Sequence, residues 1–443
     1  MLKQLKKINY RTKNYYLPIV IVVIIFTSLV FYMLFTSDSR FTGNDNIVTL
    51  HFADNITKAH AKTIERFNEK YAGRIKVVAV DLPFEKFSTN ERKELLARSM
   101  RSKSDKLDVF SVDHIWVRRF ARWTVPLDEL YDQQEIDNFI PNALEPCYVD
   151  GVLHAAPLYL DVGLMYYRSD LFEAKVHDKG VEKRLENSIT WEEFIQLSKK
   201  FDNPFYLFPA DSYEGLVCSY LEMVLNLNRS FFDTDSLDFT RPEAVKALNF
   251  LVDLVNRFKL SPKEVTSFKE NHARDYFIAN DGIFLRGWPG FVIDFNNYNL
   301  SKERINDIKQ LPLPHFAGTI PAYIFGGWNL MISKYSNHKK EAMIFLKYLT
   351  SEESQLIMFQ FGKHNPVRKD IYTNDEIIKK YPVMKYFETL FKLGVHRPFL
   401  NDYTRVSDII SLYINKAIKG DLTPERALHE ANKMIWEGRV VIR

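Results

Sequence analysis

Short apolar runs alternate with amphipathic stretches in the first part of the chain. Residues 47–52, 75–80 and 107–112 have the length and the β-branched content of buried strands. Between these runs, residues 57–71 and 91–101 repeat their apolar side chains at helical spacing. The order of strand, helix, strand, helix and strand predicts a parallel, doubly wound α/β sheet.

Helical patterns dominate the remainder of the chain. Thr190 is expected to cap a helix over 191–201, with Glu193 three positions later completing a capping box. Residues 329–333 read as a buried strand. Six further helices are expected, at 214–226, 243–258, 339–350, 354–361, 406–419 and 424–436.

Polar and aromatic residues directly follow two of the expected strands. Sheets of this kind bind ligands beyond the carboxyl ends of their strands. Asp54 and Asn55 after the first strand, and Asp113, His114 and Trp116 after the third, are therefore candidate binding residues. The aspartates have an alternative role, because either one could be a helix N-cap.

An uninterrupted apolar run lies near the N-terminus. Residues 17–36 would span about 30 Å as a helix, which matches the hydrocarbon core of a bilayer. Five basic residues and no acidic residue lie in 1–16, so the positive-inside bias places this tail in the cytoplasm. We expect an uncleaved transmembrane anchor, a linker at 37–46 and an extracytoplasmic remainder; a cleaved signal peptide and a buried core helix are the alternatives.

Composition excludes several classes of protein. At 443 residues, with 46% hydrophobic and 26% charged side chains, the chain is neither a disordered scaffold nor a disulfide-stapled miniprotein. Residues 17–443 carry 55 basic and 56 acidic side chains, which argues against a nucleic-acid partner. Cys147 and Cys218 are expected to be buried free thiols, although an exported location permits a disulfide. No spacing of Cys or His suggests a metal site.

Six segments, taken in order, resemble the extracellular solute-binding proteins of sugar ABC transporters, the broad maltose-binding-like family. GGWNLMISKYSNHKKEAMIFLKYLTSEESQ at 326–355 matches the family pattern best, and the other segments lie at 107–130, 151–174, 190–201, 277–290 and 397–431. The resemblance implies a two-lobed, periplasmic-binding-protein-like type II fold whose lobes close over an interlobe cleft by hinge bending.

The resemblance also implies how the chain is divided. Lobe one is expected over 47–157 plus 316–365, and lobe two over 158–315 plus 366–440. The proline-containing segments at 157–159 and 311–315 suit the crossings between the lobes, because proline favours extended backbone.

The candidate residues for a sugar ligand follow from sugar chemistry. Indole rings stack on the apolar face of a pyranose, and carboxylates or arginines form charge-assisted hydrogen bonds with its hydroxyls. Trp288 and Trp328 lie beside glycines, Asp161 follows the expected hinge and Arg286 precedes Trp288. Core packing is the alternative for the tryptophans, and a surface carboxylate is the alternative partner for Arg286.

Other candidates carry less weight. Arg397 and Tyr403 begin a segment that often reaches the cleft in similar proteins, and Tyr213 is weaker. The tryptophans in helical patterns are expected to pack in the core: Trp123, Trp191 and Trp436.

The sequence thus predicts a monomeric, membrane-tethered binding protein that delivers a carbohydrate to an ABC permease, with no catalytic residue, cofactor or metal. One alternative is a sensing subunit that signals to a membrane kinase or receptor. A second is an anchored glycoside hydrolase, which would need two carboxylates about 5–10 Å apart across one bond.

Overall fold

The computed structural model describes residues 47–84, 86–87, 89–234 and 237–441. The expected tail, anchor and linker at 1–16, 17–36 and 37–46 lie outside this part of the chain. Within the described ranges, no helix is both long and apolar enough to span a bilayer.

The first sheet contains the predicted β-α-β-α-β unit. Its elements are β1 (Val48–Asp54), α2 (Lys58–Lys70), β2 (Ile75–Asp81), α3 (Thr89–Arg101) and β3 (Val109–Asp113). Both β2 and β3 pair with β1 in parallel, as predicted. The whole sheet is mixed, however, because a strand from later in the chain pairs with β3 in the antiparallel direction.

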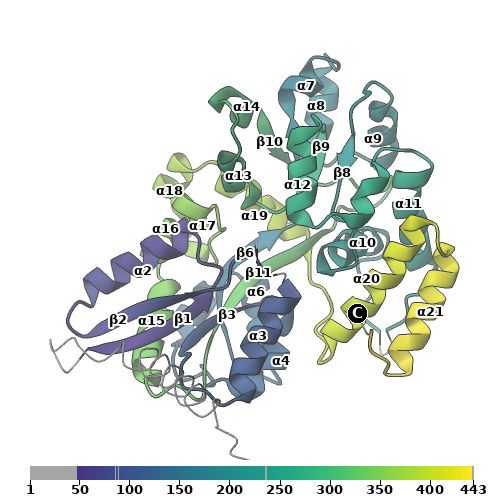
Figure 1. Cartoon of the computed structure of the whole chain (residues 1–443). Helices are drawn as coiled ribbons and strands as arrows, with labels where there is room; N and C mark the ends of the chain where they lie inside the picture. The colour runs from purple at the N-terminus through teal and green to yellow at the C-terminus, as the bar shows by residue number, and fades with distance from the viewer. Residues whose placement is uncertain (1–46, 85, 88, 235–236, 442–443) are drawn as a thin grey trace, which may run out of the picture. The chain divides into compact units, whose positions relative to one another are not determined.

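Three later strands complete this sheet. They are β6 (Ala156–Val162), β11 (Tyr323–Ile332) and β12 (Gly394–Val395). The order is β12-β11-β3-β1-β2, with β6 also paired to β11. Strand β11 runs antiparallel to both β3 and β6, and Figure 1 shows it at the centre of the described chain. The strand begins at Tyr323, earlier than the predicted range of 329–333. The sequence pattern missed the first half because the Gly326–Gly327 pair interrupts the strand signal.

A separate sheet organises the second lobe. Its strands are β7 (Leu164–Arg168), β8 (Tyr206–Leu207), β9 (Phe284–Gly287) and β10 (Ile308–Leu311), in the order β10-β7-β9-β8. Around it lie α9 (Trp191–Ser198), α10 (Glu214–Leu227), α11 (Pro242–Asn256) and α12 (Glu270–Ala279) (Figure 1). The two sheets give the chain the two-lobed, periplasmic-binding-protein-like α/β fold.

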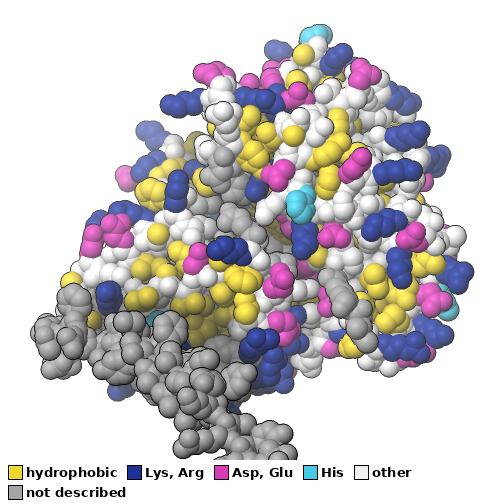
Figure 2. All heavy atoms as spheres, viewed as in Figure 1, with side chains coloured by type: hydrophobic (Ala, Val, Ile, Leu, Met, Phe, Trp, Pro, Cys, Tyr) yellow, Lys and Arg dark blue, Asp and Glu magenta, His cyan; other side chains and the backbone are white. Residues whose placement is uncertain are grey.

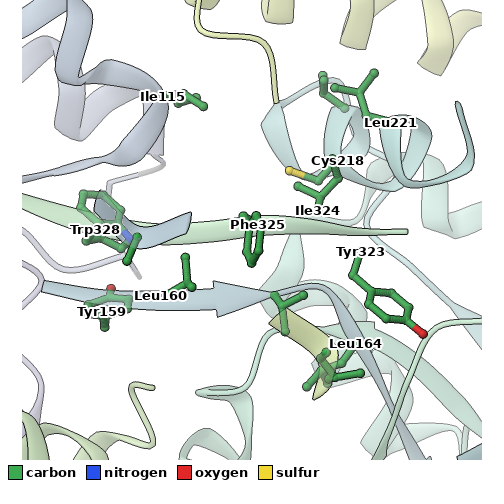
Figure 3. Packing of buried hydrophobic residues seen from close by; sticks show 14 of the residues in the cluster. Ile115, Tyr159, Leu160, Leu164, Cys218, Leu221, Tyr323, Ile324, Phe325 and Trp328 are labelled. Atoms are coloured by element: carbon green, nitrogen blue, oxygen red, sulfur yellow. The ribbon is translucent and has the colours of Figure 1, made fainter. Parts of the chain in front are cut away.

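The chain passes between the sheets at a single glycine and at longer segments. Gly163 alone separates β6 in the first sheet from β7 in the second. The predicted crossing at 157–159 lies inside β6, a few residues before Gly163. A second crossing joins β10 to β11 through 312–322. Figure 3 shows the paired strands β6 and β11, with Tyr159 and Trp328 at one end and Tyr323 toward the other.

The predicted later helices are present with small shifts at their ends. They are α15 (Lys339–Leu349), α16 (Glu352–Gly362), α20 (Tyr403–Lys419) and α21 (Pro424–Trp436). Thr190 caps α9 by accepting a hydrogen bond from the Glu193 backbone N–H at 3.3 Å. The Glu193 carboxylate accepts from the Thr190 hydroxyl at 3.4 Å, rather than from the backbone as a capping box requires.

The remaining elements lie in the connections between these helices and strands. They are η1 (His114–Trp116), α4 (Val117–Phe120), η2 (Ala121–Trp123), α5 (Gln133–Asn138), α6 (Pro141–Leu144), η3 (Glu145–Cys147), β4 (Tyr148–Val149), β5 (Val152–Leu153), α7 (Ser169–Glu173), α8 (Lys179–Glu186), η4 (Lys263–Ser267), α13 (Phe291–Asp294), η5 (Phe295–Asn297), α14 (Lys302–Asn306), α17 (Lys369–Thr373), α18 (Asp375–Lys380) and α19 (Val383–Leu393).

Cys147 and Cys218 are buried free thiols, which confirms the preferred interpretation of the two cysteines.

Candidate functional site

An arginine–aromatic stack lies in the first lobe around Trp328. This residue belongs to β11, is 7% exposed and pairs in register with Asp113 of β3 and Tyr159 of β6. The Arg92 guanidinium carbon lies 4.2 Å from the centre of the Trp328 ring and 4.3 Å from that of Phe84. Arg92 therefore contacts both aromatic rings, which themselves meet edge to face at 5.6 Å between centroids.

Asp54 holds the Arg92 side chain in place through an ion pair. Its Oδ1 accepts a hydrogen bond from Arg92 Nη2 at 2.8 Å, and His60 Nε2 lies 3.2 Å from its Oδ2. Burial alone would raise the pKa of Asp54, but the charges of His60 and Arg92 and the hydrogen bonds lower it to about 2. The N-cap alternative for Asp54 is wrong, because Thr57 caps α2 with His60 in a capping box.

Two other predicted residues lie beside this stack. Trp116 is 2% exposed, and its ring meets the Trp328 ring edge to face at 6.3 Å between centroids. The Asn55 side-chain oxygen accepts a hydrogen bond from the Phe84 backbone N–H at 3.3 Å. Asn55 thus holds the segment that carries Phe84.

A second stack of the same composition lies in the other lobe. Arg286 Nη2 and Nε donate to the two carboxylate oxygens of Glu222 at 2.7 and 3.3 Å. The Arg286 guanidinium carbon lies 4.2 Å from the centre of the Trp288 ring. The partner expected on the surface is therefore a buried carboxylate on α10. Burial raises the pKa of Glu222 although Arg286 opposes the shift.

The two stacks approach each other at β11. A Cβ added to Gly326 would lie 2.8 Å from the Trp288 ring, so the indole rests on the bare backbone of this strand. Trp328 lies two residues further along the same strand. The sequence-predicted tryptophans of the two lobes are thus brought to one stretch of β11.

Asp161 lies at the same place on the neighbouring strand. It pairs with Gly326 in the β6–β11 register. Its Oδ1 is buried and has no hydrogen-bond partner among the described residues. Burial raises the pKa of this carboxyl to about 7. A buried acceptor without a donor is costly unless another group supplies one.

Arg397 joins a third cluster of predicted residues. Its Nη1 donates to Glu214 Oε1 at 2.7 Å, and its Nη2 donates to Asp113 Oδ1 at 2.9 Å. The Tyr403 hydroxyl also donates to Glu214 Oε1, at 2.7 Å. Asp113 accepts from the Ile115 backbone N–H at 3.2 Å as the N-cap of η1, so its capping role is confirmed. Burial raises the pKa of Asp113, with Arg397 opposing the shift.

The remaining predicted residues are Tyr213, which directly precedes Glu214 of the third cluster, and the tryptophans expected to pack in the core. Tyr213 precedes α10, and burial together with the charge of Glu270 raises the pKa of its hydroxyl well above the usual value. Trp191 packs against Phe194 as expected. The expectation that Trp436 packs in the core is wrong: it is 66% exposed at the end of α21, where its indole N–H donates to the Leu237 carbonyl at 3.2 Å.

Sequence reasoning missed the partners of the arginines, although a local signal marks them. Arg92 stands on the buried face of α3, four and eight residues before Leu96 and Met100. Glu214 and Glu222 interrupt an otherwise apolar helix. Charged side chains at positions that helical periodicity assigns to the core are seldom buried without a partner.

One surface groove lies away from the tryptophans, and a small cavity is lined in part by Glu222 of the second stack. A groove of about 340 Å³ between α2 and α16 is lined by Lys62, Arg66, Glu353, Leu356, Ile357, Gln360 and Phe361. Neither Trp288 nor Trp328 lines it. In the part of the chain that the structure describes, no three His, Cys, Asp or Glu side chains are grouped to hold a metal ion.

Comparison with known proteins places these features in a family. A probable ABC transporter-binding protein of Deinococcus radiodurans is 27% identical over 393 residues, which are 86% of this chain and 91% of the relative. The solved structure of maltose-bound T. maritima MalE3 is 29% identical, with a TM-score of 0.78 over 88% of this chain and 99% of that one.

A more distant structure shares the fold. The solute-binding protein of Thermotoga lettingae bound with α-D-tagatose is 23% identical, with a TM-score of 0.74 over 89% of this chain and 99% of that one. The sequence model of a bacterial family matches residues 53–356, well over half of the chain. This protein belongs to the bacterial extracellular solute-binding protein family.

Proposed function

We propose that this protein captures a carbohydrate between its two lobes and delivers it to the permease of an ABC transporter. The relative named as an ABC transporter-binding protein covers nearly the whole chain, and the T. maritima relative has maltose bound. The observation that carries the proposal is that Trp288 packs on Gly326 of β11, two residues from Trp328 and beside the unpartnered Oδ1 of Asp161.

These groups match the chemistry of a sugar. Two indole rings offer apolar faces for the C–H surface of a pyranose. The Asp161 carboxylate accepts a hydrogen bond from a hydroxyl, which supplies the donor that its buried Oδ1 lacks. Asp54, Arg92, Asn55, Trp116 and Arg286 hold the rings or line the same region.

Entry of the ligand requires the lobes to separate. Trp328 is 7% and Arg92 0% exposed, so a sugar reaches them only after a hinge motion. We assign lobe one to 47–157 plus 316–365 and lobe two to 158–315 plus 366–440. Gly163, where the chain passes from β6 to β7, is the shortest crossing and the natural pivot.

The compartment follows from the N-terminal segment. We propose that residues 17–36 tether the chain to the cytoplasmic membrane with the binding lobes outside. A tether restricts the protein to permeases in its own membrane. Co-purification of a permease supports delivery to a transporter, whereas co-purification of a membrane kinase instead would support the sensing alternative.

The family is one of binding proteins rather than enzymes. A glycoside hydrolase would need two carboxylates that face the substrate. Here Asp54 and Asp113 each accept a hydrogen bond from a buried arginine instead.

A ligand screen tests the proposal. The purified full chain is titrated with mono- and oligosaccharides while tryptophan fluorescence and thermal melting are recorded. A ligand at 100 times its Kd should stabilise the native state by about 2.7 kcal/mol. We expect Trp288→Ala and Trp328→Ala to weaken binding at least tenfold, and Trp436→Ala, at an exposed site, to leave it unchanged. A flat response to every sugar would refute the carbohydrate assignment.

A further inference from the structure

Each lobe carries the same three-part arrangement of a buried carboxylate, an arginine and a tryptophan. In the first lobe the order is Asp54, Arg92 and Trp328, and in the second it is Glu222, Arg286 and Trp288. The guanidinium lies 4.2 Å from the ring centre in both. Two different parts of the sequence therefore form the same arrangement of side chains.

The charge of each arginine is already balanced inside the protein. Arg92 is 0% and Arg286 1% exposed, and their carboxylate partners lie at 2.8 and 2.7 Å. An arginine that recognises an anionic ligand presents its paired N–H groups to that ligand. Here Arg286 presents Nη2 and Nε to Glu222, and Arg92 presents Nη2 to Asp54.

What remains of each guanidinium suits an uncharged acceptor. Arg92 Nε and Nη1 and Arg286 Nη1 are buried and lack a hydrogen-bond partner among the described residues. These N–H groups can donate to hydroxyl or ring oxygens. They do so without a net positive charge behind them, because Asp54 and Glu222 supply the compensating negative charge.

The other cations near the site also have carboxylate partners. Arg397 lies between Asp113 and Glu214, at 2.9 and 2.7 Å. The Lys93 ammonium, near the Trp116 ring, lies 3.3 Å from Glu94, a carboxylate that also pairs with Arg101 and Arg119. Figure 2 shows basic and acidic side chains interspersed on the face that it draws, without a broad field of one sign. The three arginines Arg92, Arg286 and Arg397 thus face four buried carboxylates.

Asp161 has no matching cation. No ion pair joins it to another described residue, and burial, rather than a neighbouring charge, raises its pKa. The region around the two tryptophans thus has balanced arginines and one additional carboxyl. An anionic group brought here would lose its hydration and meet no free positive charge.

We infer that the site selects uncharged carbohydrates and rejects sugar phosphates and sugar acids, with Asp161 as the residue that sets this preference. The inference rests on the proposed function, since it assumes that the sugar lies between Trp288 and Trp328. Arg92 and Arg286 are positioning residues in this account: they hold the indole rings and donate to neutral oxygens.

Matched probe sets test the inference on the purified full chain by isothermal titration calorimetry. One set is glucose, glucose 6-phosphate and glucuronate; a second is maltose and maltobionate; a third is mannitol and mannitol 1-phosphate. We expect binding in at least one set, with the neutral member at least 100-fold tighter than its anionic counterparts. Tighter binding of an anionic member would overturn the inference and leave carbohydrate binding standing. Absence of binding in all sets would overturn both.

Two variants separate charge from shape. Asp161→Asn removes the additional carboxyl, and we expect the neutral-to-anionic ratio to fall at least tenfold. Glu222→Gln uncovers the charge of Arg286, and we expect the anionic member to gain at least tenfold in affinity. Trp436→Ala serves as the control and leaves the ratio unchanged. An unaltered ratio in both charge variants would show that shape alone selects the ligand, which would contradict the inference.

Discussion

Arg397 is predicted to be essential for stability because it neutralises two buried carboxylates at once. Its side chain is 2% exposed, and those of Asp113 and Glu214 are 11% and 9% exposed. Contacts of 2.9 and 2.7 Å are each worth roughly 6 kcal/mol of Coulombic attraction at an effective dielectric constant of about 20. Desolvation of the ions offsets most of this gain, so the pairs add little net stability.

Removal of one partner has a larger effect than the net value of the pairs. Arg397→Met keeps the volume but leaves Asp113 and Glu214 buried without a counter-charge. We expect the free energy of unfolding to fall by about 3–5 kcal/mol. The loss should shrink as the pH is lowered, because protonation of Asp113, whose pKa burial already raises, removes part of the uncompensated charge.

Urea unfolding of the purified full chain measures this loss, with a surface pair as control. Arg257 lies 3.2 Å from Asp253 and its side chain is 71% exposed, so Arg257→Met should cost only about 0–1 kcal/mol. Equal losses in the two variants, or a loss in Arg397→Met that does not depend on pH, would refute the electrostatic explanation.

Three further predictions concern the crossing and the buried titratable groups. Gly163→Ala places a Cβ 2.0 Å from Glu222 Oε1, so we expect it to cost about 1–3 kcal/mol in urea unfolding, whereas Gly290→Ala, with its nearest contact at 3.8 Å, should be within about 0.5 kcal/mol of wild type; equal effects would contradict this reading. Burial lowers the pKa of His364 to about 3, so the unfolded chain binds more protons than the folded chain, and stability should fall as the pH drops from about 6.5 toward 3. In thermal melts, His364→Phe should reduce this dependence of stability on pH, and an unchanged dependence would refute the prediction. The pKa of Asp161 is raised to about 7, so its contribution to stability should decline as the pH rises from about 4 to 7; Asp161→Asn should remove this component, and a variant with the same profile as wild type would exclude it.

Local patterns predicted most of the fold. The β-α-β-α-β unit follows from apolar periods of two and 3.6, and the parallel pairing of β1 with β2 and β3 follows from that order. Strand β11 extended further than predicted because the Gly326–Gly327 pair interrupts the strand signal. Gly327 has φ of 135°, and a Cβ there would lie 2.5 Å from the Tyr159 carbonyl oxygen. The exposure of Trp436 was missed because helical spacing does not show which face meets a neighbour.

The candidate site was predicted as residue types but not as an arrangement. Trp288, Trp328 and Asp161 were selected one by one, and the structure brings them to the same stretch of β6 and β11. The partners of the arginines lie far away in sequence: 284 residues separate Arg397 from Asp113, and 64 separate Arg286 from Glu222. Such pairs depend on how the sheets assemble, which no local period encodes.

The crystal structure of the full chain with the tightest carbohydrate from the screen tests the central claim most directly. The account predicts sugar density between the two lobes, with a ring against Trp288 or Trp328 and a hydroxyl within 2.5–3.0 Å of the Asp161 carboxylate, which is the usual O–H···O range. Density for the sugar in the groove between α2 and α16, or anywhere that touches one lobe only, would contradict it.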